Sequence, residues 1–449
     1  MPKAVFYILA LILFLGIPVA ASANQLDLFG FNSRATSLAN AYASLADGPE
    51  AAFYNPGALI ESRNVRVLAG YSFSVPSLTL DVTERNGGDK SDPDEVRDAR
   101  GAEAGQWLNL GVSGGIKDRV YFGLAMQLPV DGASRRKILS PDRPYFLDYD
   151  TGIFGMSLMP AMAVQLAPNF GLGAGARVTI DPWGQRWTDV PTAEGAYETN
   201  TLAESELSAQ VSPIVGFYAR SHEFLRFGLT YKGQSQSYFH KTDRQQLIPG
   251  DPNGFVEIEY EAWYNYIPRS VTVSIAGEPD EHVLITGEMS WQGWSTYKSP
   301  FPKVRLDFKA MSENDIDYAR PNVLERPSAD FDDVFVTRFG VEARVNKHLA
   351  FRLGYAFEPS PVPDQDGTTT IIDSATHVLA FGAGGNFGGK FGELVQIDFS
   401  VMDHIMTTVE YDKDADDMDE NDPESNPAWP SAEARAHYIY SGMTATIHF

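Results

Sequence analysis

Residues 225–231 read LRFGLTY, with apolar side chains at every odd position and arginine, glycine or threonine between them. The same period of two recurs at 349–355 (LAFRLGY) and at 395–401 (VQIDFSV). Successive side chains of an extended chain point to opposite faces, so each stretch predicts a β-strand with one apolar face. The pattern alone leaves two folds open: a soluble sandwich, in which the apolar face is the core, and a membrane barrel, in which it meets lipid.

The connectors between the strand-like segments alternate in length. Outer-membrane barrels have short periplasmic turns and long outer loops, whereas a sandwich has no reason to sort its connectors in this way. Short turns are expected at 117–119, 168–169, 220–222, 278–281, 346–348 and 388–390, and long loops at 83–104, 131–151, 183–204, 234–257, 295–330, 358–374 and 406–434. We therefore predict an all-β fold, a transmembrane antiparallel β-barrel of about fourteen strands with both chain ends in the periplasm. The strands are expected to begin near Val65, Trp107, Val120, Ile153, Phe170, Leu207, Phe224, Tyr264, Val283, Phe335, Leu349, His377, Leu394 and Tyr438.

Residues 1–23 are predicted to be a secretory signal peptide. Lys3 precedes an apolar run to about Ala20, and residues 21–23 (ASA) form a small-x-small cleavage site. The alternative, a membrane anchor, is disfavoured because the run is short and Pro18 interrupts it. The chain has no cysteine, which favours a fold closed by hydrogen bonds alone. The mature chain is expected to divide into a plug at 24–61 and a barrel at 62–449.

The last residues continue the apolar alternation to a terminal aromatic, through Met443, Ala445, Ile447 and Phe449. A final strand of this kind is typical of outer-membrane proteins that the barrel-assembly machinery recognises, so we expect that machinery as a partner. The alternative is an aromatic terminus that arose by chance.

The charge balance excludes nucleic acid as a partner. A net charge of −24 provides no basic patch for phosphates or for an anionic lipid surface. The acid concentrates in the long loops, where Asp412, Asp414 and Asp416 are candidate ligands of a divalent ion or of a bridge to lipopolysaccharide phosphates. The alternative is a solvated loop whose like charges repel one another.

The mature N-terminus does not have the pattern of a strand. Residues 33–46 (SRATSLANAYASLA) are small, rich in alanine and helical in character, and 47–49 (DGP) form a turn before 51–59 (AAFYNPGAL). Because small residues pack tightly where large side chains do not fit, this segment is predicted to be a partly helical plug inside the lumen.

Here the chain resembles the FadL family of outer-membrane fatty-acid and aromatic-hydrocarbon channels. The matching residues are Gly30-Phe31, Ser33-Arg34-Ala35, Ala39 to Asp47 and Phe53-Tyr54-Asn55-Pro56, with weaker matches at 228–231, 291–295 and 352–361. The family usually has Asn-Pro-Ala where this chain has Asn55-Pro56-Gly57, and we expect the glycine to loosen the plug backbone.

The resemblance implies a fourteen-stranded barrel with an N-terminal hatch, and passive diffusion of a hydrophobic small molecule, a long-chain fatty acid or an aromatic hydrocarbon. The ligand is caught among the outer loops, moves to a site inside the barrel and leaves sideways into the bilayer. We expect a monomer without a cofactor. Asn55, Pro56 and Gly57 are then the plug motif. The candidate residues for plug packing or ligand lining are Phe29, Phe31, Arg34, Phe53 and Tyr54.

Two features of the sequence are candidates for the capture site and for the lateral exit of the ligand. Apolar outer-loop residues at 145–147, at 153–154 and at Trp183 with Trp187 provide a first site or, alternatively, part of the membrane-interface girdle. Proline cannot donate a ladder hydrogen bond, so Pro160 in the fourth strand and Pro129 in the third are predicted to mark a lateral opening. The alternative is a β-bulge.

Charges of both signs are expected on the lumen face, where buried charges need partners. They either pair with one another and with plug groups such as Arg34 and Asp47, or include one cation that holds a carboxylate ligand. The expected set is Arg226, Glu288, Arg338, Glu342, Arg344, Arg352 and Asp398.

Enzyme motifs fail in this chain. Residues 111–115 (GVSGG) fit the nucleophile pattern but lie within a predicted strand, and the histidines show no metal-site spacing. The predicted function is passive transport of hydrophobic small molecules. The alternatives are a plugged barrel that acts in binding, assembly or adhesion without transport, a porin for polar solutes, which the plug argues against, and an outer-membrane lipase.

Overall fold

The computed structural model describes residues 25–84, 104–117, 119–130, 145–147, 156–189, 200–221, 224–246, 255–298, 303–308, 330–364, 371–388, 394–412 and 431–449. The predicted signal peptide lies outside this part of the chain and stays a prediction.

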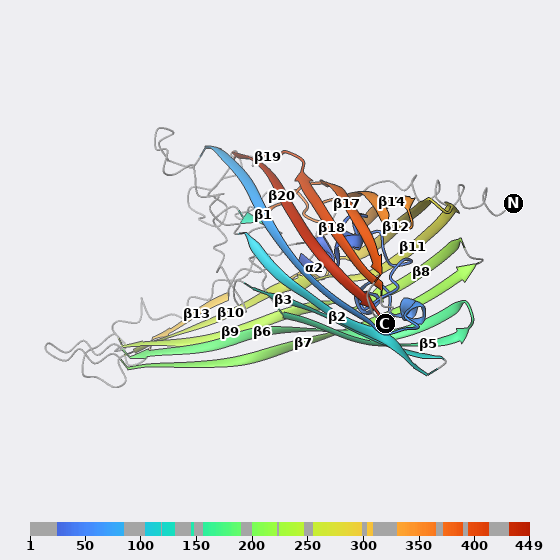
Figure 1. Ribbon diagram of the computed structural model, residues 1–449. Coiled ribbons are helices and arrows are strands. Elements are labelled where there is room, and N and C mark those ends of the chain that lie inside the picture. The colour runs from blue at the N-terminus through green and yellow to red at the C-terminus, as the bar shows by residue number, and fades with distance from the viewer. Residues whose placement is uncertain are drawn as a thin grey trace, which may run out of the picture.

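Within the described residues, fourteen antiparallel strands close into a barrel (Figure 1). Each strand pairs with the next, and β1 pairs along its whole length with β20, from Arg66 opposite His448 to Glu84 opposite Ser431. The closure confirms the predicted fold and leaves none of these strands as a free edge. The barrel strands are β1 (Arg66–Glu84), β2 (Gly105–Lys117), β3 (Val120–Pro129), β5 (Met156–Ala167), β6 (Phe170–Asp189), β7 (Asn200–Ser221), β8 (Leu225–Lys232), β11 (Arg269–Asp280), β12 (Val283–Gly293), β14 (Val334–Asn346), β15 (Leu349–Glu358), β17 (Thr376–Gly388), β18 (Leu394–Met406) and β20 (Ser431–His448).

The two faces of the strands decide between sandwich and barrel. On the outer face Leu353 is 62% exposed and Phe399 is 54% exposed, whereas their polar neighbours Arg352 and Asp398 are buried inside. A soluble protein has the opposite arrangement, because it buries its apolar face. The outward apolar band therefore meets hydrocarbon, where closure of the sheet provides hydrogen-bond partners for the backbone of the strands.

A three-stranded arm lies beyond the barrel at the end that carries the long connectors (Figure 1). It consists of β9 (Ser235–Gln246), β10 (Phe255–Ile267) and β13 (Lys303–Phe308), and β9 lies alongside β6. The prediction of loops over 234–257 and 295–330 was wrong in these places. The strand expected near Tyr264 is also misplaced, because Tyr264 lies in β10 and the barrel strand begins at Arg269.

Three short strands complete the sheets at this end. β4 (Tyr145–Phe146) pairs in parallel with β16 (Ile371–Ile372), and β19 (Val409–Asp412) pairs with the outer part of β20. β7 and β20 also begin earlier than predicted, because each extends into a connector that we expected to be a loop.

The N-terminal segment lies inside the barrel (Figure 1). It contains α2 (Gln25–Phe29), α3 (Ser33–Thr36), α4 (Ala51–Tyr54) and the 3-10 helix η1 (Pro56–Glu61). The helix expected over 33–46 is only one turn long, since Ala39 and Asn40 have positive φ angles of 49° and 61°. In the described part of the chain, helices are too short or too polar to cross a bilayer.

Candidate ligand pathway through the lumen

An aromatic cluster surrounds Phe29 at the end of α2. The Phe29 ring stacks on Tyr440 and Tyr438, with ring centroids 4.6 Å and 5.0 Å apart, and meets the His404 ring edge-on at 5.3 Å. Trp107 lies 6.3 Å away. All five side chains are buried, and the partners of Phe29 come from β2, β18 and β20. One plug residue therefore contacts three wall strands.

Smaller apolar side chains enlarge this group, which we call the Phe29 cluster. A barrel lumen is ordinarily polar, so a buried apolar lining over several adjacent strands is a distinctive feature. The further members are Leu28, Ala39, Phe146, Ala356, Ile372, Val378, Ala380, Met402, Met406, Ala434 and Ala436. Phe146 comes from the outer segment 145–147, which was expected at the capture site or in the girdle. It is 1% exposed and packs into the lumen.

A second apolar cluster lies at the end of the barrel that carries the long connectors. Tyr297 and Phe331 stack at 4.3 Å, and the Tyr266 ring lies 5.2 Å from that of Trp294. The buried members of this Trp294 cluster are Leu147, Tyr266, Trp294, Phe331, Val334 and Ile371. Phe146 and Leu147 are consecutive and belong one to each cluster, so the two clusters lie on either side of the segment 145–147.

A group of buried charges holds α2 in place. The Asp27 carboxylate accepts from Arg177 at 2.9 Å and 3.1 Å and from the Lys232 ammonium at 3.2 Å. Burial alone would raise the pKa of Asp27, but the positive charges of Arg177 and Lys232 outweigh it and lower the pKa from 3.8 to about 2. Lys232 Nζ also lies 3.5 Å from the centre of the Phe53 ring. The two wall cations are thus fixed between a plug carboxylate and a plug aromatic.

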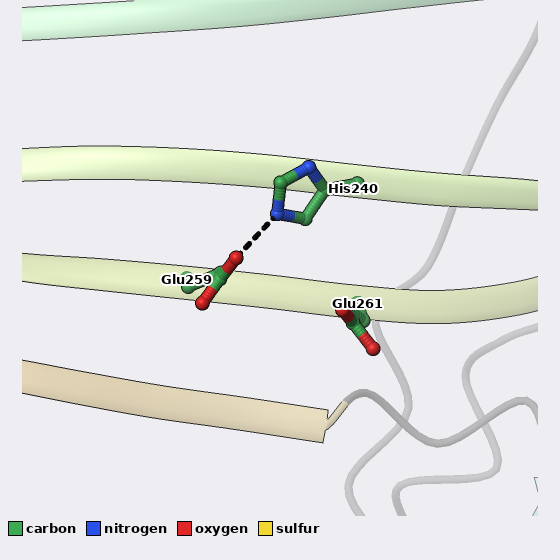
Figure 2. Close-up of side chains that lie close together, drawn as sticks. All are labelled: His240, Glu259 and Glu261. Carbon is green, nitrogen blue, oxygen red and sulfur yellow. Dashed lines mark hydrogen bonds and ion pairs between the residues drawn. The ribbon is translucent and has the colours of Figure 1, made fainter. Parts of the chain in front are cut away.

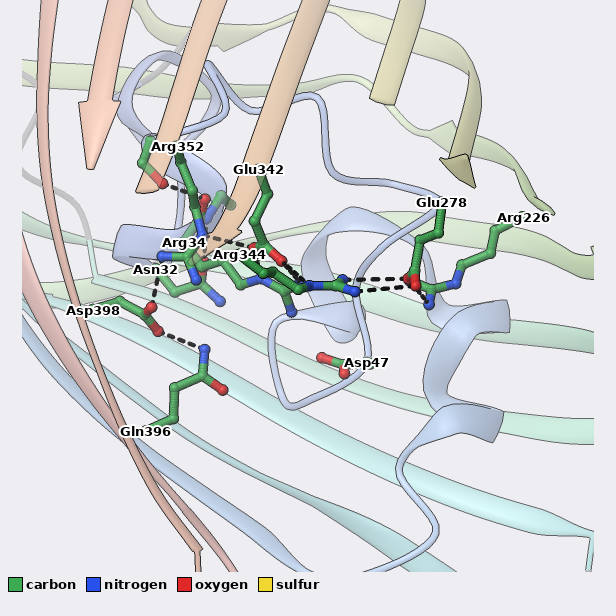
Figure 3. Close-up of polar contacts among 12 residues, drawn as sticks. Asn32, Arg34, Asp47, Arg226, Glu278, Glu342, Arg344, Arg352, Gln396 and Asp398 are labelled. Atoms are coloured by element: carbon green, nitrogen blue, oxygen red, sulfur yellow. Dashed lines mark hydrogen bonds and ion pairs between the residues drawn. The ribbon is translucent and has the colours of Figure 1, made fainter. Parts of the chain in front are cut away.

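A larger ion-pair network holds α3 against the opposite wall (Figure 3). Arg34 donates to Glu342 at 3.1 Å, and Arg352 bridges Glu342 at 2.8 Å and Asp398 at 2.7 Å. Arg344 extends the network from Glu342 to Glu278. Arg226 ends it, with a contact of 2.7 Å to Glu278. The network joins the plug to β8, β11, β14, β15 and β18.

The remaining predicted lumen charges are also paired. Arg338 contacts Glu358 at 3.1 Å and Glu288 at 3.7 Å. Glu288 in turn accepts from the Ala43 amide of the plug. The prediction that lumen charges pair with one another and with Arg34 is confirmed. Asp47 pairs with Arg66 at 3.1 Å, a residue that we did not expect in this set.

The predicted plug motif makes backbone contacts with the wall. Asn55 Nδ2 donates to the carbonyls of Ala43 and Phe217, both at 3.0 Å, and Asn55 Oδ1 accepts from the Gly57 amide. A Cβ added at Gly57 would lie 2.7 Å from the Gly216 carbonyl oxygen and 2.9 Å from the Tyr218 amide nitrogen. The expectation that Gly57 loosens the plug was wrong. Glycine is required there because the wall backbone lies directly against it.

Inward-facing glycines of the wall form the matching surface. A Cβ at Gly171, Gly173 or Gly216 would clash with residues 55–57. On the opposite wall, Gly340, Gly354 and Gly382 face residues 37–39 in the same way. The small residues of this segment pack inside the lumen as predicted, and the wall glycines that match them were not predicted.

The other predicted plug residues lie in the interior of the plug. Phe31, Phe53 and Tyr54 are buried in one apolar cluster with Tyr42. The Phe31 amide donates to the Tyr54 hydroxyl, which donates to Asn40 Oδ1 at 2.8 Å. Phe29 is thus the predicted plug residue that lies outside this cluster and packs against the wall aromatics instead.

Pro160 lies where the β5–β6 ladder is interrupted. β5 pairs with β6 at Ser157 and Leu158 and again from Ala161, but the ladder omits Met159 and Pro160. The flanking pairs keep one register, so these two residues lie opposite Arg177 and Ala176. The ladder to β3 is continuous through both residues. Pro129 pairs with Trp107 at the outer end of β3.

The structure describes the remaining predicted residues only in part. Asp414, Asp416 and residues 153–154 lie outside the described residues, and only the backbone of Asp412, Trp183 and Trp187 is described. Ser113 of the nucleophile-like stretch is buried in β2, with its hydroxyl 3.0 Å from that of Ser62. No side chain in the described ranges activates it as a nucleophile.

The ion pairs that hold α2 were not predicted from the sequence. Asp27, Arg177 and Lys232 are separated widely in the chain and form no motif. The wall aromatics Tyr438 and Tyr440 carried a usable signal, because aromatic side chains at alternate positions of the last strand occupy one face. We placed the start of that strand at Tyr438 and did not assign the face to the lumen.

Comparison with known proteins gives one family, one relative and two solved structures. The chain matches the family described as outer membrane protein transport protein (OMPP1/FadL/TodX) over residues 13–449. It is 22% identical to alkane uptake protein A of Marinobacter nauticus over 422 residues, an alignment that covers 87% of this chain and 88% of that protein. The crystal structure of a Pseudomonas aeruginosa FadL homologue superposes with a TM-score of 0.63 at 13% identity, covering 96% of this chain and 99% of the other. The Ralstonia pickettii toluene transporter TbuX superposes with a TM-score of 0.54 at 13% identity, covering 94% and 99%. These structural likenesses show a shared fold.

Proposed function

This chain belongs to the outer-membrane transport proteins of the OMPP1/FadL/TodX family, and from that premise we propose that it carries hydrophobic small molecules across the bacterial outer membrane by passive diffusion. The substrate class is long-chain fatty acids or hydrocarbons. The observation that carries the proposal is the Phe29 cluster, a buried apolar lining inside a closed barrel that also contains ion pairs between the plug and the wall.

The driving force for entry is the transfer of apolar surface out of water. Burial of each methylene is worth about 0.8 kcal/mol, so an acyl chain gains several kcal/mol in an apolar channel. The Trp294 cluster at the outer mouth provides the first such surface. Phe146 and Leu147 then connect it to the Phe29 cluster. The ligand follows this lining because each step replaces one apolar contact with another.

The Phe29 ring occupies the space that the ligand takes. α2 is held by the Phe29 contacts and the Asp27 ion pairs, together with hydrogen bonds from Thr36 and Asn40 to its carbonyls. It is the plug helix that contributes to the Phe29 cluster, so we propose that it is the element a ligand displaces. Displacement exposes Arg177 and Lys232 to the lumen. The carboxylate of a fatty acid then replaces Asp27 as the partner of Arg177 and Lys232. A neutral hydrocarbon has no group that pairs with these two cations.

The exit is the break beside Pro160. Arg177, which holds Asp27, lies opposite Met159 in the unpaired part of the β5–β6 ladder. Movement of α2 therefore releases the side chain that lies next to the gap. We place the lateral opening between β5 and β6; Pro129 lies one strand away, at the outer end of β3, where it pairs with Trp107 of β2. Replacement of Pro160 with valine restores an amide donor and is expected to slow transport.

Uptake by cells tests this function. Cells with and without the gene are given radiolabelled oleate, hexadecane and toluene, and the initial rate of uptake is measured. The gene is expected to raise uptake of at least one of the three. Phe29→Ala is expected to change that rate, while Phe351→Ala, on the lipid-facing surface, leaves it at the wild-type value.

Equal uptake with and without the gene would overturn the transport proposal and favour the alternative, a plugged barrel that acts in binding, assembly or adhesion. We further propose that the protein acts as a monomer, since its wall closes on itself through β1 and β20. The proposed partners during biogenesis are the barrel-assembly machinery and lipopolysaccharide, and the proposal includes no catalytic step and no cofactor.

A further inference from the structure

Three metal-ligating side chains converge on the outer arm, away from the lumen (Figure 2). His240 Nε2 lies 2.8 Å from Glu259 Oε1, and one donor atom from each of His240, Glu259 and Glu261 lies within 4.8 Å of the others. Among the described residues, His240, Glu259 and Glu261 form a group of histidine and carboxylate side chains close enough together to hold a metal ion.

The strand register fixes this convergence. Glu261 is the direct cross-strand partner of His240, and Glu259 lies two residues along β10, on the same face of the arm. Directly opposite residues of an antiparallel pair have Cβ atoms about 5 Å apart, a spacing that lets an imidazole and a carboxylate reach one ion. The three ligands therefore come from two adjacent strands and need only small side-chain rotations.

The donor set indicates the class of ion. A neutral imidazole suits zinc, copper, nickel and iron, whereas calcium and magnesium prefer oxygen ligands throughout. We propose that His240, Glu259 and Glu261 bind one divalent first-row transition-metal ion such as Zn²⁺, with solvent at the remaining coordination positions. One imidazole and two carboxylates neutralise the charge of such an ion.

The surroundings support this assignment. Arg305 of β13 lies 3.9 Å from Glu259 Oε2, so it orients the second oxygen of that carboxylate and leaves Oε1 facing His240. The His240 and Glu259 side chains are 40% and 35% exposed, which gives an ion direct access from the outside. The net charge of −24 also raises the local concentration of cations.

The consequence is a stiffer arm. An ion held by β9 and β10 links the two strands of a hairpin that extends beyond the barrel wall, and binding to the folded arm alone stabilises it by mass action. This site shares no residue with the acidic stretch at 412–424 or with the Phe29 cluster. It does not depend on the proposed transport function.

Calorimetric titration of the full-length protein, without a histidine tag, in detergent tests the proposal. Zn²⁺ is expected to bind at one site per chain, and His240→Ala and Glu261→Gln are each expected to weaken binding about 10-fold or more. His282→Ala is the matched control, since His282 also has acidic neighbours but lies on the short β11–β12 turn, with contacts of 3.9 Å and 4.0 Å. It should bind Zn²⁺ as the wild type does. Heat-modifiable migration on gels confirms that each variant is folded.

Two results would overturn the site: undiminished Zn²⁺ binding by folded His240→Ala, or equal binding of Ca²⁺ and Zn²⁺, which would indicate a merely acidic surface. A second measurement uses Trp263, which lies on the same strand two residues after Glu261. Cu²⁺ at the site is expected to quench its fluorescence, and the quenching should disappear both in His240→Ala and in Trp263→Phe. Quenching that persists in His240→Ala contradicts the assignment.

Discussion

At the residue scale, single side chains decide how closely the plug meets the wall. Gly57 has the backbone of β6 and β7 within about 3 Å of the place where a Cβ would lie. The Asn55 side-chain amide donates to the Ala43 carbonyl within the plug and to the Phe217 carbonyl of the wall. The plug is therefore held against β6 and β7 by close backbone packing, in addition to the ion pairs of Asp27 with Arg177 and Lys232.

Gly57→Ala tests the importance of this close approach. The added methyl must displace the wall backbone, so we expect a loss of about 1–3 kcal/mol in stability, the usual cost of overpacking. Thermal unfolding in detergent measures it. Gly287→Ala is the control, because no atom lies within 4 Å of a Cβ at Gly287. Equal unfolding temperatures for Gly57→Ala and the control would contradict the packing account.

Glu50 gives the plug a pH dependence. It is buried at the start of α4, where burial and the neighbouring Asp47 carboxylate raise the pKa of Glu50 above its ordinary 4.5. The folded plug therefore prefers the protonated acid. The stabilisation is fully present below the ordinary pKa and is lost as the pH rises through the raised one.

Hydrogen exchange of residues 47–54 measures this effect. Protection in the wild type is expected to fall between about pH 5 and about pH 8, after correction for intrinsic rates. Glu50→Gln removes the ionisation and should abolish the fall, while Glu281→Gln, an exposed turn residue, should retain it. A fall that persists unchanged in Glu50→Gln would show that another group is responsible.

At the scale of elements, the break between β5 and β6 is the feature that relates the wall to the plug. The ladder omits Met159 and Pro160, and the opposite strand contributes Arg177, which holds α2 through Asp27. Arg177 thus connects α2 to the interruption of the β5–β6 ladder. This arrangement supports the proposed lateral exit.

A removable cross-link tests the exit. The chain has no cysteine, so Pro160→Cys with Ala176→Cys introduces the only thiols, at positions that face each other across the gap. Oxidation is expected to stop uptake, and a reductant to restore it. The control is Leu353→Cys with Phe381→Cys, register partners in the wall between β15 and β17, where oxidation should have no effect. Uptake that continues through the oxidised Pro160 pair would exclude this exit.

The elements were predictable where one physical signal dominated. The alternation of apolar residues and the sorting of connector lengths predicted the number of barrel strands, because lipid on one side and short turns at one end impose both patterns. The arm strands β9, β10 and β13 were missed because the number of barrel strands was inferred from connector length, which treats all of a long connector as loop. The helix over 33–46 was overestimated, since propensity does not reveal that Ala39 and Asn40 adopt positive φ angles.

At the scale of the whole molecule, the barrel has an apolar outer surface and a lumen divided into polar and apolar parts. The prediction that lumen charges pair succeeded because an isolated charge is too costly to bury, so that partners are required whatever the details. The apolar pathway was not predictable in the same way. An aromatic residue on an inward face and one in the girdle have the same local pattern, and only the closed barrel brings Phe29 against Tyr438, Tyr440 and Trp107.

The most direct test of the central claim is the position of a bound hydrophobic ligand. Crystals of the full-length protein are soaked with a brominated long-chain fatty acid, and the bromine atoms are located by anomalous diffraction. The account predicts a peak inside the barrel at the Phe29 cluster, with α2 displaced. Bromine peaks confined to the outward apolar band, with Phe29 still stacked on Tyr440, would contradict it.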